Sequence, residues 1–277
     1  MVVDVIGRFY CLSTPVQALI ATLFTWGVTV LGAGVVFAFK RINKSVMDAM
    51  LGFAGGVMIA ASYFSLLSPA LDMAESIGST PWLTVAAGFM CGGLLLFIGD
   101  KAFGVLDRLD RSSRREADDG RRRSLKRCWM LIFSITLHNI PEGMAVGVAF
   151  GSLEYGLEGA TLAAALMLAL GIGLQNFPEG TAVSVPLRRE GFTRGKAFFY
   201  GQLSGIAEPL AGVAGALLVM KARMLLPFLL AFAAGAMIYV VVEELIPESQ
   251  TNEKKDLMAL FTLIGFSVMM AMDVALG

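Results

Sequence analysis

The chain contains little charge. Only 16% of its 277 residues are Asp, Glu, Lys or Arg, whereas 56% are hydrophobic and the mean hydropathy is +0.72. These values lie outside the usual range of soluble globular domains. The first residues include Asp4 and Arg8 but no strongly basic stretch, so a cleaved signal peptide is not indicated. The composition therefore predicts an integral membrane protein.

Several chemical signatures are also absent. The three cysteines, Cys11, Cys91 and Cys128, share no C-x-x-C spacing, so neither a disulfide framework nor a thiolate metal site is expected. The chain has no P-loop, which argues against an ATP-driven pump, and no H-E-x-x-H motif, which argues against a zinc protease. Its only histidine is His138.

Long apolar runs recur along the whole chain. Most approach or exceed the roughly 20 residues that cross a bilayer as a helix. We expect an all-α membrane protein, with one transmembrane domain over residues 1–277 and a flexible loop at 104–126. The eight predicted helices lie at about 12–39, 47–70, 81–103, 128–151, 159–186, 197–220, 224–246 and 257–275.

Positive charge alternates between the connections. Lysine and arginine gather after the first, third, fifth and seventh predicted helices, as in the arginine-rich loop 104–126. Cytoplasmic loops retain positive charge, so both termini are expected on the outer side. The same bias accounts for the arginines of the loop, and no nucleic-acid partner is expected.

Two polar motifs interrupt this apolar background. "LHNIPEG" occupies 137–143 and "LQNFPEG" occupies 174–180, in consecutive predicted helices that must run antiparallel. The repeat predicts inverted-repeat character, with the two motifs facing each other at mid-membrane. Residues four apart share a helix face, so His138 stacks on Glu142 and Gln175 stacks on Glu179. Asn139 and Asn176 stand three residues before the same glutamates.

A third glutamate, Glu208, lies at the middle of the sixth predicted helix, close to the level of both motifs. Each charge at the bilayer centre costs at least about 2.5–3.5 kcal/mol, and no lysine or arginine lies at this depth, so the glutamates need a cation. Imidazole, carboxylate, amide and the thioether of Met58 suit a borderline transition ion. The sequence predicts a binuclear site with two bridging glutamates.

"HNIPEG", "QNFPEG" and the "AEP" of 207–209 resemble the signature of the ZIP (ZRT/IRT-like) family of divalent-metal transporters, most closely its bacterial, GufA-like branch. The resemblance implies uptake of Zn²⁺, or of Cd²⁺, Fe²⁺ or Mn²⁺, into the cytoplasm across a bacterial inner membrane by alternating access. The implied metal ligands are Met58, His138, Asn139, Glu142, Gln175, Asn176, Glu179 and Glu208.

The resemblance also implies a transport path. Ser65, Asp72 and Asp273 match entrance positions, and Asp48, Asp100, Glu243 and Glu244 match exit positions. Asn176 stands where some relatives have aspartate, which bears on the second ion. The expected partners are divalent ions and the lipid bilayer, and a homodimer is left open. The alternative from another class is an intramembrane metal-dependent hydrolase, because a metal with an open position activates water.

Overall fold

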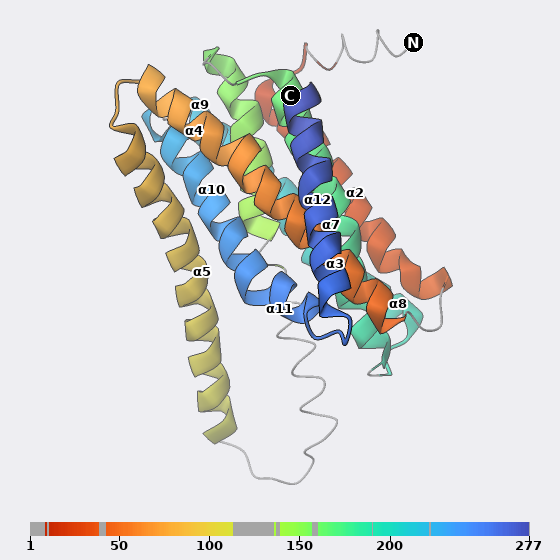
Figure 1. Cartoon of the computed structure of the whole chain (residues 1–277). Helices are drawn as coiled ribbons and strands as arrows, with labels where there is room; N and C mark the ends of the chain where they lie inside the picture. The colour runs from red at the N-terminus through yellow and green to blue at the C-terminus, as the bar shows by residue number, and fades with distance from the viewer. Residues whose placement is uncertain are drawn as a thin grey trace.

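In a computed structural model of the chain, the structure describes residues 9, 11–38, 43–112, 136, 139–156, 160–189, 191–221 and 223–276. These residues form helices and turns, and no β-strand occurs among them. The helices cross in a bundle in which α2 begins and α12 ends at the same end (Figure 1).

Helices make up most of the described chain. In chain order they are α2 (Thr14–Ala38), α3 (Lys44–Ala61), α4 (Ser68–Ser76), α5 (Pro81–Ser112), α7 (Leu162–Arg189), α8 (Arg194–Ser204), α9 (Ala207–Lys221), α10 (Leu226–Val240), α11 (Ile246–Ser249) and α12 (Lys255–Leu276). Residues 139–152 are helical as well. The short elements are the π-helical turns η1 (Ser62–Leu67) and η4 (Val241–Leu245) and the 3₁₀ turns η2 (Leu153–Tyr155) and η3 (Arg223–Leu225).

Seven stretches of the described chain are long and apolar enough to cross a membrane. They are Thr14–Ala38, Lys44–Ser76, Pro81–Gly99, Leu162–Arg188, Arg194–Lys221, Leu226–Ser249 and Lys255–Ala275. The eighth predicted helix, 128–151, lies partly outside the described residues. The all-helical membrane fold predicted from composition is confirmed.

Two local details differ from the sequence expectation. Helix α5 continues to Ser112, whereas a flexible loop was expected from 104. The charges there mark the end of the apolar span at Gly99, but a helix can continue into water beyond it. The predicted helix 197–220 is interrupted between α8 and α9, where the N–H of Glu208 reaches only the carbonyl of Gly205, at 3.1 Å. Pro209 explains the turn, because it has no N–H to continue the helical ladder onto Gly205.

Prolines also widen two long helices. In η1 the N–H of Ser68 bonds to the carbonyl of Tyr63, five residues back, and in η4 Ile246 does the same to Val241. Pro69 and Pro247 follow at once and cannot donate to the residue four back. Such π turns are rare and often occur at functional sites.

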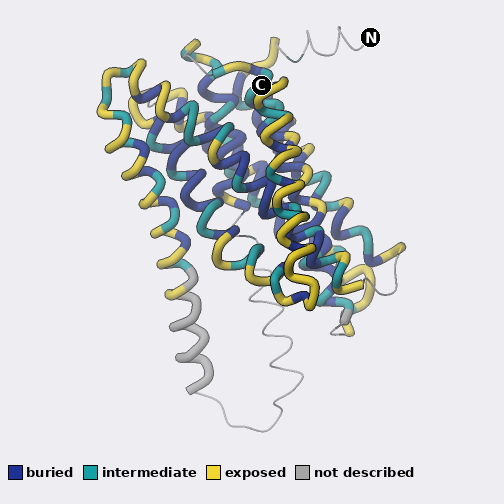
Figure 2. The backbone as a smooth tube through the Cα atoms, viewed as in Figure 1, coloured by how far each residue is buried: buried dark blue, intermediate teal, exposed yellow. Residues whose placement is uncertain are grey.

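Glycines bring pairs of helices into backbone contact. A Cβ on Gly56 of α3 would lie 1.9 Å from the carbonyl oxygen of Thr262 in α12, and one on Gly32 of α2 would lie 2.1 Å from that of Phe177 in α7. Small residues allow this approach in membranes, where helices gain from packing rather than from water exclusion. Figure 2 shows the buried residues on the central helices and exposed residues along α5 and α12.

Candidate metal centre

The two motif copies meet inside the bundle. Gln175 of α7 donates from Nε2 to Oε1 of Glu142 in helix 139–152, at 2.7 Å, and both side chains have no exposed surface. The prediction that the copies face each other is confirmed. Helix α7 runs on unbroken through Pro178. Because Pro178 has no N–H, the helix loses only one backbone hydrogen bond there, the one to the carbonyl of Leu174.

The third glutamate joins the same cluster from α9. Asn176 donates from Nδ2 to both carboxylate oxygens of Glu208, at 2.9 Å each, and reaches the carbonyl of Thr25 at 3.1 Å. The hydroxyl of Thr25 also bonds to Glu208, and that of Thr29 lies 3.4 Å away from it. Four donor contacts therefore hold one fully buried carboxylate.

Thr25 and Thr29 were missed by the sequence reasoning. Both lie on α2 and are buried. The available signal was the spacing of Thr22, Thr25 and Thr29 on one side of an apolar span. Threonines in helices commonly bond to their own backbone, as Thr22 does to Ala18 at 2.7 Å, so the pattern alone does not indicate a site.

The amide groups leave their oxygens unused. Asn139, Gln175 and Asn176 each direct the nitrogen at a carbonyl or a carboxylate, which can only accept, so the oxygen must point the other way. Their buried oxygens, together with Oε2 of Glu142, find no donor among the described residues. Buried polar atoms are rarely left unpaired, so four in one cluster indicate a ligand with positive charge.

Charge supports the same conclusion. Glu142 experiences repulsion from Glu179 and Glu208, and Glu179 experiences it from Glu208 and Glu244. No described lysine or arginine counters these glutamates. Buried carboxylates without a partner are costly, and a bound cation removes that cost. Of Glu142, Glu179 and Glu208, Glu179 is the one that keeps some exposed surface, at 6%.

The remaining predicted ligands differ in what the structure shows of them. His138 lies outside the described residues. Asn139 is 1% exposed and donates to the carbonyl of Ser204 at 2.8 Å. Met58 is fully buried in α3, and its role as a ligand stays a prediction. Within the described part of the chain, no three His, Cys, Asp or Glu side chains form a metal cluster. Three of the eight predicted ligands are amides, so the predicted donor set is mixed.

Of the predicted entrance residues, Ser65 and Asp273 come together. Ser65 of η1 donates to the Asp273 carboxylate of α12 at 2.9 Å. Asp72 is exposed on α4, apart from that pair in the hydrogen-bond pattern. Their place on a path stays a prediction.

The predicted exit residues divide similarly. Glu243 and Glu244 both lie in η4, the first exposed and the second half-buried. Asp48 is 1% exposed and accepts a hydrogen bond from Nδ2 of Asn252 at 2.8 Å. Asp100 lies in α5, with its side chain outside the described part. Of the exit side chains that the structure describes, Glu244 is the one that interacts with the cluster, through charge repulsion with Glu179.

Membrane-spanning helices around a buried, polar, cation-attracting cluster define a membrane transport protein. The family model described as ZIP Zinc transporter matches residues 107–273, which is more than half of the chain. The chain therefore belongs to the ZIP family.

Relatives extend the match over nearly the whole chain. The Zinc transporter ZIP11 of Bos taurus is 41% identical over 335 aligned positions, covering 94% of this chain and 97% of its own. ZIPB of Bordetella bronchiseptica is 36% identical, with 91% of this chain and 79% of its own covered. GufA of Myxococcus xanthus is 33% identical, with 94% and 98% covered. All three are named as zinc transporters, so the hydrolase alternative has no support.

Proposed function

We propose that this protein carries divalent transition-metal cations, zinc first, through the membrane into the cytoplasm. The observation that carries the proposal is a set of four buried oxygens that find no donor in the described part of the chain, on Asn139, Glu142, Gln175 and Asn176. They come from both motif copies and lie beside three mutually repelling glutamates. The relatives named as zinc transporters support the choice of metal.

The donor chemistry supports a borderline ion. Carboxylate and amide oxygens, with the imidazole of His138, match zinc and its neighbours, whereas magnesium prefers an all-oxygen, largely hydrated shell. The zinc ion is the substrate and must be released again. The site therefore cannot be a structural zinc site in which four thiolates enclose the ion. A mixed set of neutral amides and carboxylates meets that need.

Transport by alternating access is part of the proposal. Two antiparallel helices that carry inverted copies of one motif are typical of carriers whose halves move around a central site. The residual exposure of Glu179 and its interaction with Glu244 support release toward η4. With the lysine and arginine distribution, this end faces the cytoplasm of a bacterial inner membrane, and both termini lie outside.

Flux into liposomes tests the proposal. The purified chain is reconstituted, and uptake of zinc and cadmium is followed with a trapped fluorescent indicator. We expect saturable uptake that His138→Ala with Glu142→Ala abolishes while the variant stays folded and inserted. Wild-type flux in that folded double variant would end the metal-site proposal.

A further inference from the structure

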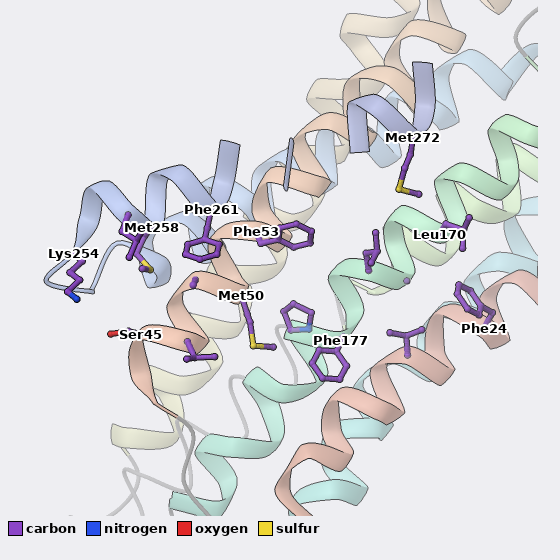
Figure 3. A pocket seen from close by; sticks show the side chains of 17 residues that line it. Phe24, Ser45, Met50, Phe53, Leu170, Phe177, Lys254, Met258, Phe261 and Met272 are labelled. Atoms are coloured by element: carbon purple, nitrogen blue, oxygen red, sulfur yellow. The ribbon is translucent and has the colours of Figure 1, made fainter. Parts of the chain in front are cut away.

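A long apolar groove runs beside the metal centre. Its volume is about 900 Å³, and it lies between α2 and α7 on one side and α3 and α12 on the other. Figure 3 shows Lys254 and Ser45 at one end and Phe24, Leu170 and Met272 toward the other. Every other lining residue in the described ranges is apolar or glycine, so the described groove has a single polar end.

That polar end is held in place by hydrogen bonds. Asn252 donates from Nδ2 to Asp48 at 2.8 Å and to the hydroxyl of Ser45 at 3.1 Å, and its Oδ1 accepts from the N–H of Lys254 at 2.9 Å. The ammonium of Lys44 lies close by, 3.3 Å from the carbonyl of Thr251. No acidic residue occurs among the described residues that line the groove, and the nearby Asp48 carboxylate is occupied by Asn252, so Lys254 makes this end favour an anion.

Length and polarity together select the occupant. From Lys255 to Met272, α12 rises roughly 25 Å at about 1.5 Å per residue, most of the about 30 Å hydrocarbon core. An acyl chain fits the apolar length, and a phosphate at its head fits Lys254. The positive-inside distribution puts that end on the cytoplasmic side, where anionic lipids concentrate.

The groove and the metal centre share one stretch of α7. Leu174, Phe177 and Pro178 line the groove, while Gln175 and Asn176, between them in sequence, bond to the glutamates. The groove also separates two glycine-packed pairs, α2 with α7 and α3 with α12. A chain bound there contacts both pairs at once.

We propose that an anionic phospholipid binds in this groove, with its acyl chain between the two helix pairs and its phosphate against Lys254, and that its binding raises the rate of transport. The effect on rate rests on the proposed function, whereas lipid binding does not. A ligand shifts an equilibrium only by its differential affinity for the two states. The rate effect therefore requires the groove to change between the outward and inward arrangements.

Native mass spectrometry of the delipidated full chain, titrated separately with phosphatidylglycerol and phosphatidylcholine, tests binding. We expect one tightly held phosphatidylglycerol and weaker phosphatidylcholine. Lys254→Gln should weaken phosphatidylglycerol roughly five-fold, the effect of one basic residue near an anionic lipid. The matched control is Lys255→Gln, the next residue along, which is exposed but does not line the groove and should change nothing.

A second variant tests the apolar part. Val46 is 52% exposed and lines the groove, so Val46→Trp should fill it without disturbing the core and should reduce retention of both lipids. Leu263→Trp is the control, since Leu263 is 61% exposed and lies outside the groove. Equal retention by Val46→Trp and wild type, or equal affinity for the two lipids, would overturn the lipid site. So would a cysteine at 46 that cross-links to a second copy of the chain.

Zinc flux separates the two proposals. The wild-type protein is reconstituted in phosphatidylcholine vesicles with and without one fifth phosphatidylglycerol. Phosphatidylglycerol should raise the zinc flux, and the Val46→Trp substitution should abolish that rise. If the flux is zero in all vesicles while phosphatidylglycerol binds as described, transport is refuted and the binding site stands. If the flux is normal and insensitive to phosphatidylglycerol, the role of the lipid in transport is refuted.

Discussion

Replacing Asn176 with aspartate reverses the polarity of the contact with Glu208. In the natural chain, the amide of Asn176 donates to both oxygens of that carboxylate and to the carbonyl of Thr25. Aspartate can only accept, so the same position would place a second carboxylate against the first. Without a cation we expect this variant to be less stable than the natural chain.

The size of the effect follows from the lost and the added interactions. A hydrogen bond to a charged group contributes about 1.5–3 kcal/mol. Two like charges 4 Å apart repel by about 4 kcal/mol at an effective dielectric constant of 20, and protonation of one carboxylate relieves part of that. The metal-free variant should therefore lose about 3–5 kcal/mol. Zinc at a hundred times its dissociation constant returns about 2.7 kcal/mol.

Charge also predicts the number of ions. Two divalent ions bring +4 and the three glutamates bring −3, so the natural site would keep one uncompensated charge when doubly occupied. The Asn176→Asp substitution would remove that excess. We expect one tight zinc ion in the natural chain and two in the variant, with slower release of the second.

Thermal unfolding and metal counting on the same samples check this reasoning. The melting temperature is measured in chelator and in excess zinc, and bound zinc is counted by mass spectrometry. Asn176→Ala is the control, because it loses the donor without gaining charge and should be destabilised with no special rescue by zinc. If the aspartate variant melts like the natural chain in chelator, or if the natural chain already binds two ions equally tightly, the charge argument is wrong.

Three further outcomes are expected. Thr25→Val removes a hydroxyl donor to Glu208, costing about 1–3 kcal/mol; it should slow zinc flux several-fold, whereas Thr25→Ser should keep it. In a background without native cysteines, single cysteines at Asp72 and at Glu244 should label reciprocally as zinc is added, and full labelling of both at once would indicate a channel. Gly92→Ala places a Cβ 1.9 Å from a backbone oxygen of α10 and should destabilise the protein by about 1–3 kcal/mol, whereas Gly27→Ala, with nothing within 4 Å, should not.

The pairing of the motifs could be predicted because it depends on order along the chain. Consecutive spans run antiparallel, so equal motifs at equal depth must meet, and the bond from Gln175 to Glu142 shows that they do. Polar groups inside an apolar span stand out in sequence. Glu208 could be identified as a candidate ligand for the same reason.

The donors around Glu208 could not be predicted in the same way. Thr25 and Thr29 belong to α2, far from Glu208 in sequence, and their partner depends on how α2 crosses α9. The turn before Glu208 was missed because apolar runs show where a span lies but not whether its backbone is continuous. The π turns η1 and η4 were missed for the same reason, although Pro69 and Pro247 lie beside them.

Anomalous diffraction from crystals grown with cadmium tests the central claim most directly, because it locates the ion without relying on activity. We expect the strongest peak within bonding distance of Oε2 of Glu142 and Oε1 of Gln175, two oxygens where the motifs meet that have no hydrogen-bond partner among the residues the structure describes. The peak should vanish in a folded Glu142→Gln with Gln175→Leu variant. A strongest peak elsewhere in the bundle, with none between these two side chains, would contradict the account.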